Sequence, residues 1–316
     1  MLSASGQAAG SWLQHNTCSV KTKYVIQLIA LSALWGASFM LIRIASPLLG
    51  PNVLAALRIG VATLTLAVLM RAMQHRWPIK HWRELALLGA LSVAFPFLLF
   101  AWAALQLPAG YSALLNTTAV VFGIFTAAWL KEDTLTLRKL IGCVCGFTGV
   151  ALIVGLGPVK PSLQVVLAAL ACVAASACYG ISTPLMKRAI GRMQPLEIAA
   201  GIHGVSLLML LPGAVWSWPQ AQFTPGALAA LAVMGVVTSG LAYWLHLRIL
   251  AHVSPVAAMS PTFLVPVFGV TWGHLFLGEK LSSGIYAGGA LVLVASALVT
   301  GFNPWRQALD VVDAEL

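Results

Sequence analysis

Two ionisable side chains, Arg58 and His203, stand inside long apolar stretches of the sequence. Charged groups inside a lipid bilayer are costly and usually serve a function. Arg58 could attract the carboxylate of a substrate, and His203 could form a hydrogen bond with it or titrate. The alternatives are structural, because Arg58 could hold the carbonyls of a neighbouring helix and His203 could be a satisfied contact between helices. The sequence leaves both open.

Carboxylates are missing from the middle of the apolar stretches. The eight acidic residues lie at the edges of the stretches, between them or in the tail: Glu84, Glu132, Asp133, Glu197, Glu279, Asp310, Asp313 and Glu315. A pump that exchanges protons for cations needs an acid inside the membrane, so the pattern argues against a dedicated cation pump. The histidines, cysteines and acids also lack the clustering of a metal or catalytic site. We expect no catalytic residue, no metal and no cofactor.

Aromatic, hydroxyl and amide side chains gather in some of the apolar stretches. Such groups on mostly apolar walls are typical of small-molecule sites. The string ALWGASFMLIR (33–43) returns as ACYGISTPLMK (177–187), each with a deep aromatic residue, a serine and a terminal base. The candidate substrate-binding residues are Trp35, Ser38, Arg58, Trp102, Asn116, Tyr179, Ser182, His203 and Thr262. The competing explanation is that the hydroxyls bond carbonyls of their own helices.

The elements that carry these residues are apolar enough to lie in lipid. Of the 316 residues, 60% are hydrophobic and only 8% are charged, whereas about a quarter are charged in a typical soluble domain. The net charge of +10 is spread over short connections, so it does not form the continuous basic face of a nucleic-acid-binding protein. The composition predicts an integral membrane protein with the lipid bilayer as its partner.

Ten apolar runs are long enough to be spanning helices, for which about 20 residues are needed. The predicted spans are 24–44, 51–71, 84–104, 108–129, 138–156, 163–186, 195–216, 225–246, 255–277 and 284–303. With the N-terminus in the cytoplasm, fourteen of the 18 Lys and Arg residues fall on the cytoplasmic side and three on the outer side. Cytoplasmic loops carry the excess of basic residues, so both termini are predicted to be cytoplasmic.

The chain repeats itself. Residues 33–43 and 51–61 match residues 177–187 and 195–205 at nine of 22 positions, always at an offset of 144. Further on, at an offset of 147, Glu132 falls on Glu279. Weak internal symmetry of this kind marks transporter repeats, and five helices per copy invert the second copy in the membrane. The predicted fold is all-α, with ten transmembrane helices in two inverted five-helix repeats, 24–156 and 163–303, between cytoplasmic tails 1–23 and 304–316.

These residues resemble EamA-type transporters of the drug/metabolite transporter superfamily. The resemblance rests on the Trp-Gly-x-Ser-Phe string at 35–39 with its base at Arg43, on Arg58 in the second span, and on Pro-led spans that end in Glu (108–132 and 255–279). It covers about residues 24–303. It implies an exporter of amino acids or other small metabolites in the bacterial inner membrane.

The expected function is therefore export of a small metabolite by alternating access, most simply of neutral or aromatic amino acids, by a monomer. The inverted repeat favours alternating access over a channel. The alternatives are an exporter of multiple drugs or cationic compounds and, with less support, an integral membrane enzyme.

Overall fold

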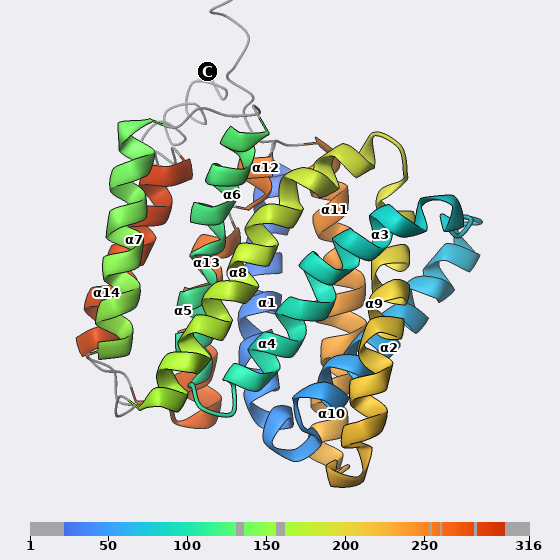
Figure 1. The fold of residues 1–316 in the computed structure, drawn as a ribbon, viewed down its shortest axis with the longest axis horizontal. Helices are drawn as coiled ribbons and strands as arrows, with labels where there is room; N and C mark the ends of the chain where they lie inside the picture. The colour runs from blue at the N-terminus through green and yellow to red at the C-terminus, as the bar shows by residue number, and fades with distance from the viewer. Residues whose placement is uncertain are drawn as a thin grey trace, which may run out of the picture.

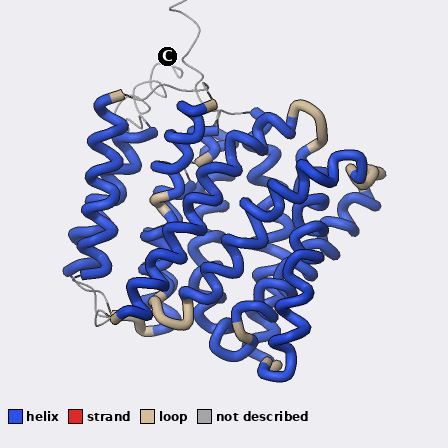
Figure 2. The backbone as a smooth tube through the Cα atoms, in the orientation of Figure 1, coloured by secondary structure: helices blue, strands red, loops and turns tan. Residues whose placement is uncertain are grey.

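The computed structural model describes residues 22–130, 136–155, 162–252, 255–259, 261–280 and 283–300. Every regular element within these ranges is a helix, and the connections between helices are mostly short (Figure 2). The prediction of an all-α protein is confirmed. Residues 1–21 of the predicted N-terminal tail, the predicted C-terminal tail 304–316 and Glu132 lie outside the described residues, whereas Thr22 and Lys23 already belong to the first helix.

Seven helical segments of the described chain are long and apolar enough to cross a membrane. They are Ile26–Leu49, Pro51–Ala72, Ile79–Ala103, Ala109–Trp129, Leu163–Ile190, Pro195–Gln220 and Pro225–His252. They coincide with seven of the predicted spans. The other three predicted spans fall on α7 (Leu137–Gly155), on α12 (Pro255–Ala258) with α13 (Pro261–Leu277), and on α14 (Ser283–Thr300). The count of ten spans and the inverted repeat stay predictions.

The first half of the chain begins with two unbroken helices, and its third and fourth spans are segmented. The elements are α1 (Thr22–Leu49), α2 (Pro51–Ala72), η1 (Ile79–His81), α3 (Trp82–Gly89), η2 (Ala90–Ala94), α4 (Phe95–Ala103), α5 (Ala109–Asn116) and α6 (Ala119–Trp129). The break between α5 and α6 falls at Thr117 and Thr118, whose hydroxyls donate to carbonyls three residues earlier. Such local bonds compete with the helical ladder.

The second half follows a similar order. Its elements before α12 are α8 (Leu163–Ile190), α9 (Pro195–Ser217), η3 (Trp218–Gln220), α10 (Pro225–Val233), η4 (Met234–Leu241) and α11 (Ala242–His252). Both η2 and η4 are π-helical, with wider turns than an α-helix. They interrupt the third and the eighth predicted spans. Turns of this kind occur frequently at functional sites.

The two halves interlock. Helices α7 and α14 pack together at one edge of the bundle (Figure 1). Elsewhere α2 packs on α9, α1 on α13, and α8 on α6. The π-helical segments also cross over, because α2 packs on η4 and α9 packs on η2. Each of these contacts joins one half to the other, so the halves do not form separate bodies.

Two glycines allow the closest of these approaches. Gly36 and Gly180 hold the same place in the repeated string, 144 residues apart. A Cβ atom at Gly36 would lie 2.6 Å from Cβ of Phe268 on α13, and one at Gly180 would lie 2.6 Å from the carbonyl oxygen of Ala119 on α6. Small residues let helix backbones approach in membranes. In each string the residue before the glycine is aromatic, Trp35 in the first and Tyr179 in the second.

Candidate functional site

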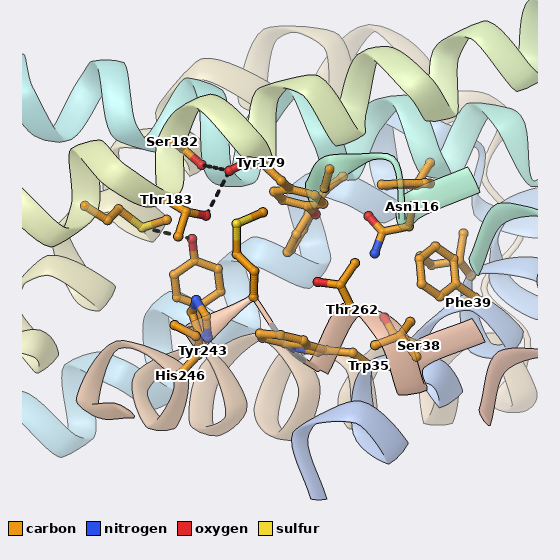
Figure 3. A pocket seen from close by; sticks show the side chains of 18 of the residues that line it. Trp35, Ser38, Phe39, Asn116, Tyr179, Ser182, Thr183, Tyr243, His246 and Thr262 are labelled. Carbon is orange, nitrogen blue, oxygen red and sulfur yellow. Dashed lines mark hydrogen bonds between the residues drawn. The ribbon is translucent and has the colours of Figure 1, made fainter. Parts of the chain in front are cut away.

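A cavity of about 120 Å³ lies inside the bundle, among side chains from both halves (Figure 3). It is well above the roughly 10–15 Å³ that one water molecule needs by a comparable measure. Most of its lining is apolar or aromatic, as is usual for small-molecule sites. Seven of the nine predicted residues line it: Trp35, Ser38, Arg58, Asn116, Tyr179, Ser182 and Thr262.

The two copies of the repeated string supply two walls of the cavity. Trp35 from α1 and Tyr179 from α8 lie on opposite sides of the view, with Thr262 between them (Figure 3). The Trp35 ring donates from Nε1 to the carbonyl oxygen of Thr238 at 3.2 Å. The Tyr179 ring is stacked with Phe100, with ring centroids 6.2 Å apart. These contacts fix both aromatic faces in place.

The buried base of the cavity is Arg58, which is only 5% exposed. Its Nε donates to Oγ of Ser239 at 2.7 Å, and its Nη2 to Oγ1 of Thr238 at 3.4 Å. Its guanidinium carbon lies 4.0 Å from the centroid of the Phe97 ring. Both hydroxyls belong to η4, so the wide π-helical turn brings them to the arginine. Arg58 thus holds a neighbouring helix and also faces the cavity.

The carboxylates of the described residues are engaged elsewhere. Glu84 pairs with Arg192, and Glu197 lies 3.2 Å from Nδ1 of His75. Glu279 accepts a hydrogen bond from the backbone N of Ala109 at 2.7 Å. Within the described ranges, no acidic side chain makes an ion pair with Arg58. Its hydrogen bonds there go only to neutral groups.

Three polar atoms of the cavity lining are buried without a hydrogen-bond partner among the described residues: Ser38 Oγ, Asn116 Oδ1 and His246 Nδ1. A buried polar atom left unpaired costs about 1–3 kcal/mol. The three come from α1, α5 and α11. Atoms of this kind that face one space are suited to bind a polar small molecule or water.

The hydroxyls on α8 bond within their own helix, as the competing explanation holds. Ser182 and Thr183 both donate to the carbonyl oxygen of Tyr179, at 3.1 and 2.9 Å. Both residues nevertheless line the cavity. Their oxygen atoms remain able to accept a further hydrogen bond.

Two predicted residues do not line the cavity. Trp102 is 39% exposed, on the side of α4 away from the cavity. Phe100 lines the cavity, and a residue two positions further along a helix points about 200° around the axis. His203 is fully buried, with Nδ1 at 2.8 Å from the carbonyl oxygen of Ala199 and its ring against Tyr243 at 5.0 Å. It lies behind Tyr243.

The sequence reasoning missed several lining residues. Tyr243 and His246 come from α11, and the ring centroid of His246 lies 5.1 Å from that of Trp35. Phe97 and Phe100 come from α4. The i, i+3 spacing of both pairs puts each on one helix face, which was the available signal. The sequence did not show which face of each helix points into the cavity.

Comparison with known proteins decides the family. A model described as the EamA-like transporter family matches residues 22–155 and again residues 166–301. The chain belongs to the EamA-like transporter family. The predicted resemblance is confirmed, and this EamA-like chain is a multi-pass membrane transporter, not an enzyme.

Relatives align over most of their length. An uncharacterised transporter, YvbV of Bacillus subtilis (strain 168), is 26% identical over 285 residues, which cover 88% of this chain and 92% of YvbV. A probable terminal-alkyne amino-acid exporter of Streptantibioticus cattleyicolor is 28% identical over 287 residues, 88% of this chain and 93% of the relative. A crystal structure with 15% identity covers 86% of this chain with a TM-score of 0.66 and shows the fold alone.

Proposed function

We propose that this EamA-like transporter exports small carboxylate-bearing metabolites, most simply neutral or aromatic amino acids, by alternating access. The observation that carries the substrate class is Arg58, a buried base at the cavity whose described partners are all neutral. A buried charge without an opposite charge is strongly unfavourable. A substrate carboxylate would supply the missing partner.

The unpaired atoms of the lining fit the other end of an amino acid. Asn116 Oδ1 is an acceptor, and His246 Nδ1 accepts in one of its neutral tautomers. An ammonium group offers three donors and no acceptor. The rings of Trp35 and Tyr179 offer apolar area to a side chain. Among relatives, the one named a probable terminal-alkyne amino-acid exporter agrees with this class.

A cationic-compound exporter is the weaker alternative. Arg58 would repel a cation, and no acid of the described residues contacts it to offset that charge. The aromatic walls alone could attract a cation through their faces. A fixed positive charge at the cavity disfavours a cation there.

The proposed transport cycle uses ten spans in two inverted repeats, 24–156 and 163–303. Its support is the double family match and the crossed packing, in which α1 meets α13 as α8 meets α6. Rocking of one helix bundle against another, each built from helices of both repeats, exposes a central site to either side. We place the protein in a bacterial inner membrane, and the base asymmetry supports cytoplasmic termini. The proposal takes the transporter as a monomer, since helices from both halves of a single chain are enough to line the cavity.

Uptake and counterflow in proteoliposomes test this function. The substrates are a set of amino acids, the matching amides that lack the carboxylate charge, and the matching amines. Saturation and counterflow with the amino acids are expected for a carrier. A membrane enzyme would alter the compounds, and a channel would show no counterflow.

Arg58→Gln provides the residue-level test. Hydrogen bonds to charged groups contribute about 1.5–3 kcal/mol, so KM for amino acids should rise by about tenfold to a hundredfold. The ratio of KM for the amides to KM for the amino acids should decrease. The matched control is Arg71→Gln, at the exposed end of the same helix, which should change neither. Unaltered discrimination in Arg58→Gln would reject the carboxylate assignment.

A further inference from the structure

The bases that end the two copies of the repeated string make equivalent contacts. Nη1 of Arg43, near the end of α1, donates to the carbonyl oxygen of Ala104, just after α4. Nζ of Lys187, near the end of α8, donates to the carbonyl oxygens of Leu250 at 2.6 Å and Ala251 at 3.2 Å, near the end of α11. Arg43 and Lys187 are 144 residues apart, and Ala104 and Ala251 are 147 apart. The two offsets are those of the repeat.

The physical reason for each contact is the same. The last carbonyls of a helix have no partner within the helix, and they carry partial negative charge that attracts cations. Both bases are half-buried, and the alanines they reach are buried or half-buried. A charge-assisted hydrogen bond in this setting is among the stronger kinds. Each base therefore ties the first span of its half to the third.

An acid holds the other end of the connection that follows α4. Glu279, just after α13, accepts from the backbone N of Ala109 at 2.7 Å and of Gly110 at 3.3 Å, at the start of α5. Arg43 on α1 and Glu279 just after α13 thus hold the two ends of residues 104–110. Helices α1 and α13 pack on each other. The first comes from one half of the chain and the second from the other.

The two sets of contacts lie on opposite faces of the bundle. Five residues beyond Arg43, the carbonyl oxygen of Leu48 accepts from the backbone N of Gln222 at 2.8 Å, which places this end beside the turn after Gln220. Five residues beyond Lys187, Arg192 pairs with Glu84, on the face that also carries Gln74. We call these the Gln220 face and the Gln74 face. The cavity, with Trp35 and Tyr179, lies between them.

We propose that Arg43 and Glu279 form a latch that closes the Gln220 face, and that Lys187 closes the Gln74 face in the same way. This rests on the proposed alternating-access function. The latches hold the connection after α4 and the end of α11, and α4 and α11 each supply lining residues of the cavity. Opening one face requires its latch to release, while the other stays formed. These three are positioning residues, since none of them lines the cavity.

The test measures access to the cavity from each face. Val265, which lines the cavity, is replaced by cysteine in the full chain after its native cysteines have been changed to alanine. A membrane-impermeant maleimide is then applied to the Gln220 face or to the Gln74 face of oriented vesicles. The quantity of interest is the ratio of the two labelling rates. It reports the balance of open states and not the folding stability.

Opposite shifts are expected from the two latches. Arg43→Met and Glu279→Gln should each raise labelling from the Gln220 face by about tenfold, given the usual strength of charged hydrogen bonds. Lys187→Met should instead raise labelling from the Gln74 face. The conservative Arg43→Lys keeps a cation at the helix end and should restore the original ratio. Controls are Lys280→Met and Lys80→Met, exposed bases near the two faces.

The outcomes separate this proposal from the proposed function. If the unsubstituted chain shows amino-acid counterflow but the labelling ratio does not move in opposite directions, the latches are wrong and the function stands. If counterflow fails but the ratios shift as expected, the substrate proposal is wrong and the latches stand. Lower thermal stability with an unchanged ratio would make these contacts structural only. If Lys187→Met does not fold, Lys187→Gln, which removes the charge and keeps a polar side chain, replaces it in the same measurement and should raise labelling from the Gln74 face.

Discussion

Gly180 provides a sharp test of how the two halves pack. A methyl group at this position would lie 2.6 Å from the carbonyl oxygen of Ala119, 2.6 Å from the backbone N of Gly123 and 2.7 Å from Cβ of Phe122. Two of these atoms are main-chain atoms of α6, which cannot swing aside as a long side chain can. Ordinary contact begins near 3.4 Å, so α6 and α8 must separate locally by roughly 0.8 Å.

The expected loss of stability follows from a comparison of two glycines, Gly180 and Gly60. Overpacking a well-packed interior costs about 1–3 kcal/mol. Replacing glycine by alanine inside a helix otherwise stabilises it by about 1 kcal/mol. Gly60 on α2 is the matched control, because a Cβ there would meet only Cδ1 of Leu207 at an ordinary 3.7 Å. The helix contribution is common to both variants, so Gly180→Ala should be about 2 kcal/mol less stable than Gly60→Ala.

The assay is thermal denaturation of the purified chain in detergent, followed by size-exclusion chromatography of the folded fraction. About 2–4 °C of midpoint shift per kcal/mol is typical of larger domains, so the two variants should differ by roughly 4–8 °C. Gly36→Ala, against Phe268 and Gly269 of α13, should behave as Gly180→Ala does. Transport should also fall in Gly180→Ala, because Tyr179 and Ala119 both line the cavity.

Equal midpoints for Gly180→Ala and Gly60→Ala would refute this reasoning. That result would mean that α6 and α8 are not in close contact in the protein, and that the repeated glycine has another cause. A loss of stability in Gly60→Ala of the same size would point to a general requirement for flexibility and not to helix approach.

Two further predictions concern orientation and substrate contact. A cysteine placed at Gln220 should be labelled by an impermeant reagent added outside whole cells, and one at Gln74 should not; the reverse pattern would overturn the proposed orientation. Trp35→Ala and Tyr179→Ala should each weaken transport of an aromatic substrate more than of a small one, because apolar contact scales with ring area. Leu291→Ala on α14 should change transport of neither the aromatic nor the small substrate. If both aromatic variants transport every substrate as the unsubstituted chain does, the two rings serve only in packing.

The sequence was sufficient for the class of fold, because hydropathy is a local property. An apolar run of about 20 residues has to be helical in lipid, where each backbone polar group needs a partner within its own segment. The repeat could also be predicted directly from matching residues, and one family model matches the chain twice, at 22–155 and 166–301. Exact ends were harder to predict: α1 reaches Leu49 and α8 reaches Ile190, past bases whose charge is met by distant carbonyls.

Part of the candidate site could likewise be read from residue types. Arg58, Trp35 and Tyr179 stood out because bases and deep aromatics are rare in an apolar run, and all three line the cavity. The partners of Arg58 could not be read in this way. Thr238 and Ser239 lie about 180 residues away, and they reach the guanidinium through a π-helical turn with no recognised sequence signal.

Side-chain direction was decided only by the tertiary structure. Phe100 and Trp102 are both aromatic residues of one apolar helix, yet one faces the cavity and the other is exposed. The sequence of a helix that is apolar all round does not tell which face meets its neighbours. His246 and the bases at Arg43 and Lys187 depend on the same choice. Their roles follow from which helix ends meet, and that is set by packing between residues far apart in the chain.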